Sequence, residues 1–182
     1  MKKGGGPLGV RVQQSTVQQY TASLYYWAPK WEASLSSTYM PSQDRMHPEY
    51  QTEGLYYDAA FTIRPTDNFS ITPTLSLQTE RYRWNGTKSE TPMAMLTLMW
   101  NSVVERLDFY SFGMYMRSFS TDGWMDTKMT YIQNSLRYDI GKEKGRRYLS
   151  FDVIYNRYAD AVYRIGNTEE MLGRVLFTLT RL

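Results

Sequence analysis

The chain has 182 residues, a formal net charge of +3 and no cysteine. This length fits a single domain, and the near-balanced charge argues against a nucleic-acid-binding protein. The lack of cysteine excludes a disulfide framework and thiol chemistry, and no apolar run approaches the roughly 18–20 residues that a membrane-spanning helix requires.

The N-terminal residues 1–7 differ in composition from the rest of the chain. Lys2 and Lys3 are followed by glycines and not by the apolar segment of a signal peptide, so we expect an added or flexible N-terminus here. Residues 8–182 show strand-like alternation almost throughout, with no linker, and predict a single β-barrel domain. Residues 8–17 either form a strand of their own or extend the one that follows.

Alternation of apolar and polar residues predicts about nine strands joined without intervening helices, as an antiparallel up-and-down meander. A total of about 8–10 is the working range, because single-chain bacterial barrels usually have even numbers. In chain order the predicted strands cover residues 19–27, 31–40, 54–64, 69–84, 93–100, 108–119, 129–140, 148–160 and 174–182.

One face of the predicted strands is apolar. Such a face points to the core of a soluble barrel, as in a lipocalin-like fold, or to lipid in a membrane barrel. The strands are longer than the about 5–6 residues of an average strand and suit the about 9–11 residues that cross a bilayer. We therefore favour the membrane barrel. Its predicted lipid-facing residues are Phe69, Ile71, Leu75, Leu77, Phe151, Val153 and Phe177.

The opposite, polar face is rich in Ser, Thr, Asn, Gln and Tyr, with scattered charges. Small polar groups and paired charges suit a narrow barrel interior, because an unpaired buried charge is costly. We expect the charged residues to pair across this interior, as a polar plug or as the lining of a pore. The predicted network is Asp58, Arg64, Glu80, Arg117, Arg137, Asp139, Asp152 and Arg174.

Tyrosine and tryptophan gather near the ends of the predicted strands. These amphipathic aromatics favour sites between oil and water, such as the two interfaces of a membrane. The predicted interface residues are Trp31, Tyr39, Trp84, Trp100 and Trp124.

The whole pattern resembles the bacterial outer-membrane β-barrel proteins as a class. The last strand, GRVLFTLTRL, is similar to the terminal strand of that class, although it ends in Leu182 where Phe or Trp is usual. The resemblance implies a periplasmic C-terminus, short periplasmic turns and longer outer loops. It also implies an outer-membrane location in a Gram-negative bacterium, with the lipid bilayer as partner and lipopolysaccharide as a further candidate.

Two residues test this interpretation. Pro73 falls within a predicted strand, where its missing N–H requires an edge or a bulge. His47 is the single histidine, and a lone histidine in a polar loop lacks the companion ligands of a metal site or the spaced motif of a hydrolase. We therefore predict no metal, no cofactor and no enzymatic activity.

The sequence thus predicts a small pore or a structural component of the outer membrane. Three alternatives stay open. The first is part of a larger barrel or export assembly. The second is a soluble β-barrel that binds a small apolar ligand. The third is a lipid-modifying enzyme of the outer membrane.

Overall fold

The computed structural model describes residues 15–44, 51–140, 147–164 and 166–179, and these form one antiparallel β-sheet. The long alternating segments favour extended backbone, since each strand can then keep one apolar and one polar face. The strands are β1 (Ser15–Val17), β2 (Tyr20–Ala28), β3 (Trp31–Asp44), β4 (Thr52–Thr66), β5 (Phe69–Tyr82), β6 (Lys88–Val104), β7 (Leu107–Ser120), β8 (Asp126–Asp139), β9 (Arg147–Asp160) and β10 (Thr168–Leu179).

The first two strands share one edge of the sheet. β1 pairs with β3 through Ser15 opposite Asp44, and β2 pairs with the same strand through Tyr20 opposite Tyr39. The described part of the segment 8–17 therefore extends the first predicted strand, with a short interruption, and the sheet has nine strand positions. From β3 to β10 each strand pairs with the next in sequence, so the predicted meander is confirmed.

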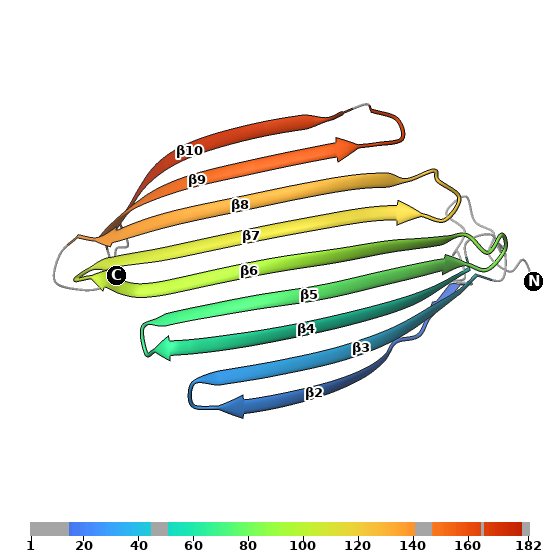
Figure 1. Ribbon diagram of the computed structural model, residues 1–182, viewed down its shortest axis with the longest axis horizontal. Helices are drawn as coiled ribbons and strands as arrows, with labels where there is room; N and C mark the ends of the chain where they lie inside the picture. Colours follow the sequence, from blue (N-terminus) through green and yellow to red (C-terminus); the bar gives the residue numbers. More distant parts are fainter. Residues whose placement is uncertain (1–14, 45–50, 141–146, 165, 180–182) are drawn as a thin grey trace, which may run out of the picture.

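The sheet is open within the described residues. β2 pairs with β3 alone and β10 with β9 alone, and these two edge strands lie at opposite margins of the sheet (Figure 1). The closed barrel that the alternation predicted is therefore not formed by these residues by themselves. The all-β, antiparallel character of the prediction stands.

Some boundaries differ from the prediction. Residues 101–104, expected to be a connection, continue β6, and Lys88 already begins that strand. The predicted bulge at Pro73 is also displaced: Ala60 opposite Thr74 and Ile63 opposite Ile71 keep one register across the proline, and the shift occurs between Ile63 and Thr66. The charged turn expected at 141–147 lies outside the described residues except for Arg147.

No aliphatic, aromatic or methionine side chain among the described residues is buried. The buried polar residues are Thr62, Ser76, Thr79, Asp139, Ser150 and Asp152. The register places all of them except Thr79 on the polar face. Because no second layer covers the sheet within the described residues, neighbouring side chains on the same face shield these groups. No helix in the described ranges is long and apolar enough to cross a membrane.

Candidate functional site

The polar face of the sheet collects seven of the eight predicted network residues. Cross-strand partners point to the same side of a sheet, and the pairs Asp58–Ser76 and Ser135–Asp152 define this face. The seven residues are Asp58, Arg64, Glu80, Arg137, Asp139, Asp152 and Arg174. They come from five different strands and do not form one cluster.

The best-connected carboxylate on this face is that of Asp152 on β9. Nε and Nη2 of Arg174, directly opposite on β10, both donate to Oδ2, at 2.9 and 2.7 Å. The Ser135 hydroxyl on β8 donates to Oδ1 at 2.6 Å. Asp152 is only 6% exposed, so these bonds offset the cost of burying its charge.

A second ion pair lies near the β2 edge. Nη2 of Arg64 on β4 donates to Oε1 of Glu32 on β3 at 2.9 Å, and the Tyr25 hydroxyl donates to Oε2 at 3.0 Å. Glu32 was not among the predicted network residues. The alternation within residues 31–40 already indicates that Glu32 lies on the polar face, because it stands between the apolar Trp31 and Ala33.

In a third charged cluster, one arginine contacts both a carboxylate and an aromatic ring. Nη2 of Arg137 lies 3.2 Å from Oδ1 of Asp139, and its guanidinium carbon lies 4.2 Å from the ring centroid of Tyr148. Asp139 is 2% exposed, the lowest exposed fraction among the buried polar residues of the described ranges. The ion pairs thus join residues on neighbouring strands or on the same strand, whereas the sequence predicted pairing across an interior.

The remaining two predicted acids bind neutral hydroxyl groups. Asp58 accepts a hydrogen bond from Ser76 at 2.5 Å, and Glu80 accepts one from Tyr56 at 3.1 Å. Glu80 also lines an open groove of about 430 Å³ on the polar face, together with Gln78 and Trp124. This groove lies at the sheet end that carries the turns 83–87, 121–125 and 161–167.

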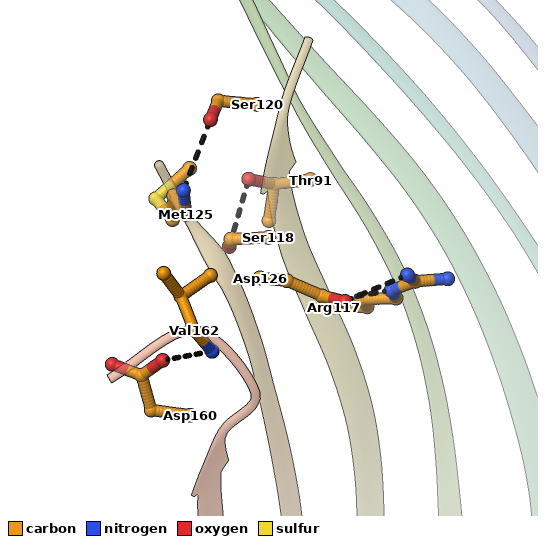
Figure 2. A network of polar contacts seen from close by, with 8 residues as sticks. All are labelled: Thr91, Arg117, Ser118, Ser120, Met125, Asp126, Asp160 and Val162. Atoms are coloured by element: carbon orange, nitrogen blue, oxygen red, sulfur yellow. Dashed lines mark hydrogen bonds and ion pairs between the residues drawn. The ribbon is translucent and has the colours of Figure 1, made fainter. Parts of the chain in front are cut away.

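Arg117 is the exception in the predicted network. The register pairs Ala94 with Tyr115, so Arg117, two residues further along β7, points to the apolar face. There it forms an ion pair with Asp126 of β8, with Nε and Oδ1 2.9 Å apart (Figure 2). The assignment of Arg117 to the polar face was wrong, because β7 has large apolar residues at both parities.

The seven predicted lipid-facing residues lie together on the apolar face. Phe69 is opposite Trp100, and Val153 is opposite Asn134 and Gly173 along the same side. Their side chains are exposed or half-buried, with Leu75 at 62% and Phe177 at 60%. No described segment covers this face, so its apolar surface meets the surroundings of the protein.

The apolar face changes character at one end. Charged residues gather within the last four strand positions next to the turns 83–87, 121–125 and 161–167, and we call them the charged collar. The collar consists of Glu53, Arg81, Lys88, Glu90, Arg117, Asp126, Lys128, Arg157 and Glu169. At the opposite end the apolar face carries one described charge, Arg147 at the start of β9.

The collar holds like charges directly opposite each other. Arg81 faces Lys88 across β5 and β6, and Arg117 faces Lys128 across β7 and β8. Such pairs are destabilising unless anions compensate them. Lys88 pairs with Glu90 and Arg117 with Asp126, which leaves basic charge available on this surface.

Two of the predicted interface aromatics lie at the end away from the collar. Trp31 stacks on Tyr26 with centroids 4.5 Å apart, and Phe69 lies 5.4 Å from Trp100. The other three lie at the collar end: Tyr39, 6.3 Å from Tyr20, and the exposed turn residues Trp84 and Trp124. The apolar face between these two levels spans about nine residues per strand, as in Phe69–Leu77 of β5.

The turn between β7 and β8 is organised by a carboxylate. Hydrogen bonding by the Ser120 hydroxyl is the largest cause that lowers the pKa of Asp122. The backbone N–H of Trp124 and the hydroxyl of Thr87 donate to the same carboxylate at 3.3 and 3.1 Å. Nearby, Ser120 accepts from the Met125 backbone N–H at 3.0 Å, and Thr91 donates to Ser118 at 2.9 Å (Figure 2).

His47 lies outside the described residues. Within the described ranges, no group of three His, Cys, Asp or Glu side chains is placed to hold a metal ion. Comparison of the chain with protein-family models, with curated protein sequences and with solved structures finds no match.

Proposed function

We propose that this chain spans the outer membrane of a Gram-negative bacterium as an antiparallel β-sheet, non-enzymatically, as a small pore or a structural component. In this arrangement the apolar face meets lipid and the polar face lines a water-filled interior. One observation carries the proposal: buried side chains are polar and sit almost entirely on one face, while the apolar face is uncovered.

A soluble β-barrel that binds an apolar ligand would need the reverse arrangement. Its apolar face would form the interior, and its polar face would meet water. In the described sheet Asp152 and Asp139 are shielded on the polar face, whereas the side chains of the apolar face are exposed or half-buried. This favours the membrane-spanning sheet over the soluble alternative.

The charged collar supports one orientation in the membrane. Basic side chains next to an apolar belt suit the level of phosphate-bearing headgroups, and Trp31 and Trp100 suit the opposite interface. We propose that the collar faces the outer leaflet, where lipopolysaccharide supplies the phosphates. The turns 83–87, 121–125 and 161–167 then lie outside the cell.

Folding in detergent micelles against folding in plain buffer tests the proposal. We expect a soluble, β-rich state in micelles, with heat-modifiable migration in gels, and aggregation in buffer. A stable, monodisperse protein in buffer without detergent would overturn the membrane-spanning proposal. Conductance in planar bilayers then separates a pore, which gives current steps, from a structural component, which is silent.

A further inference from the structure

The two edge strands of the sheet leave backbone groups without a ladder partner. β2 and β10 each pair on one side within the described residues. In a hydrocarbon environment every unsatisfied N–H or C=O costs several kcal/mol. If the chain spans a membrane as proposed above, both edges must therefore pair with another strand.

Both edge strands expose apolar side chains on both faces of the sheet. β2 exposes Leu24 on the apolar face and Trp27 on the polar face, and β10 exposes Val175 and Leu172 in the same way. Leu24 is 72% and Val175 63% exposed. Strands with apolar residues on both sides are typical of positions covered on both faces, so these edges have the composition of a contact region.

Direction limits the ways in which the edges can meet. With nine alternating strand positions, β2 and β10 run the same way, so they pair with each other only as parallel strands. Closing one chain on itself would bring together edges that lie at opposite margins of the sheet (Figure 1).

We propose that copies of this chain join edge to edge, with β10 of one copy beside β2 of the next, and so close a barrel with a shared interior. The proposal rests on the proposed function. A head-to-tail interface between identical copies forms a closed ring when its rotation closes. Such a ring uses both edges of every copy and leaves none exposed to lipid.

The charged collar favours identical copies in one orientation. All copies in a head-to-tail ring point the same way across the membrane, so their collars form one continuous band. Pairing β10 with β10 in antiparallel fashion would instead invert one copy and place its collar in the opposite leaflet. The apolar faces of β2 and β10 would also join into a continuous belt through Leu24 and Val175.

The chain has no cysteine, so engineered cysteines report on the seam without background. One pool carries Leu24→Cys on β2, and three other pools carry Gly173→Cys, Val175→Cys or Phe177→Cys on β10 to cover the possible registers. Each β10 pool is folded with the Leu24→Cys pool in detergent, oxidised, and analysed on a non-reducing gel. A disulfide requires Cβ atoms about 3.5–4.5 Å apart.

We expect one β10 cysteine to form a disulfide-linked dimer with Leu24→Cys. This dimer should be several-fold more abundant than the dimer that the same β10 cysteine forms with Leu96→Cys. Leu96 is the matched control because it is exposed on the same face but lies in β6, at the centre of the sheet. Leu24→Cys folded by itself should give only this background, since β2 does not meet β2 in a head-to-tail ring.

The double variant Leu24→Cys/Val175→Cys, diluted with excess unmodified protein, detects self-closure. An intrachain disulfide there, or no dimer above the Leu96→Cys background at any register, would overturn the pairing between copies. Heat-modifiable migration is read on the same samples. Protein that inserts without cross-linking overturns only this inference, whereas protein that does not insert overturns the proposed function as well.

Discussion

Arg174 and Asp152 face each other across β10 and β9, with Nη2 and Oδ2 2.7 Å apart, at the last strand pair before the open edge. The carboxylate is nearly buried, although no apolar layer covers it. Its shielding comes from neighbours on the same polar face, including Ser135. The pair therefore shows in one place how this sheet buries charge and leaves its apolar residues uncovered.

Arg174→Ala should destabilise the folded sheet. The substitution leaves the buried Asp152 carboxylate with the Ser135 hydroxyl as its remaining side-chain donor among the described residues, and such a loss costs about 1–3 kcal/mol. Urea unfolding in lipid vesicles, followed by tryptophan fluorescence, measures the change. The control is Arg83→Ala, which removes the ion pair with the more exposed carboxylate of Glu53 and should cost clearly less, because solvent screens that pair. Equal losses would contradict the role of burial.

Leu75→Arg should impair membrane insertion. Leu75 lies in the middle of the apolar face, and an arginine on the lipid face costs about 2–4 kcal/mol at the bilayer midplane. The matched control is Thr74→Arg, at the same depth but on the polar face, where water would solvate the guanidinium. The folded fraction in vesicles, read from gel migration, compares the two. Impairment by Thr74→Arg alone would reverse the assignment of the two faces.

Asp122 should make the turn 121–125 sensitive to acid. Its pKa is lowered in the folded state, chiefly by the hydroxyl of Ser120. The carboxylate therefore contributes stability that is present above its unfolded pKa of about 3.9 and lost as the pH falls through the lower folded value.

Trp124 lies in the same turn and reports on it. We expect its fluorescence to change as the pH falls below about 4, and Asp122→Asn to remove this step while loosening the turn at neutral pH. An unchanged acid transition in Asp122→Asn would show that another group is responsible.

A pore formed by this sheet should prefer cations. Acidic residues outnumber basic ones on the polar face, and rings of carboxylates favour cation passage. The acids are Glu32, Asp58, Glu80, Asp108, Asp139, Asp152, Asp160 and Glu170, against Arg64, Arg137 and Arg174.

The reversal potential across a KCl gradient measures this preference. Glu80→Gln, in the groove near the turns, should shift it toward zero. Glu90→Gln, an acid of similar depth on the apolar face, should leave it unchanged. A pore that prefers anions would contradict the assignment of these acids to its lining.

The charged collar should bind anionic headgroups. Lys128→Ser/Arg157→Ser removes two basic side chains that have no ion pair within the described residues. We expect slower and less complete insertion into vesicles of anionic phospholipid, and no change in zwitterionic vesicles. Lys30→Ser, in the turn at the opposite end, should behave like the unmodified chain. Equal effects in both vesicle types would indicate a folding defect and contradict headgroup binding.

Parity predicted most of the sheet and most of its faces. In β5 the large apolar residues occupy one parity, and in β8 and β9 most of them do, so strand position and face followed together from residues such as Leu75 and Phe151. The same rule placed Asp152 and Arg174 on one face, where the structure finds them paired. Glu32 obeyed the rule as well and could have been included as the partner of Arg64.

The rule does not apply to β7 because both parities there are large and apolar. Met114 and Tyr115 are equally acceptable on either face, and only the pairing of Ala94 with Tyr115 decides that Arg117 points to the apolar side. Pro73 is similar. Proline has no backbone N–H, so one hydrogen bond of the ladder is missing at this position. Whether a bulge forms there depends on the register with both neighbouring strands.

The sequence by itself determined that the chain forms long antiparallel strands with one apolar and one polar side, because the two-residue period is local. The tertiary structure decided which side carries the shielded polar groups, which ion pairs form between neighbouring strands, and that β2 and β10 remain apart at the two margins. Curvature and register depend on contacts between distant segments, and no local pattern contains them.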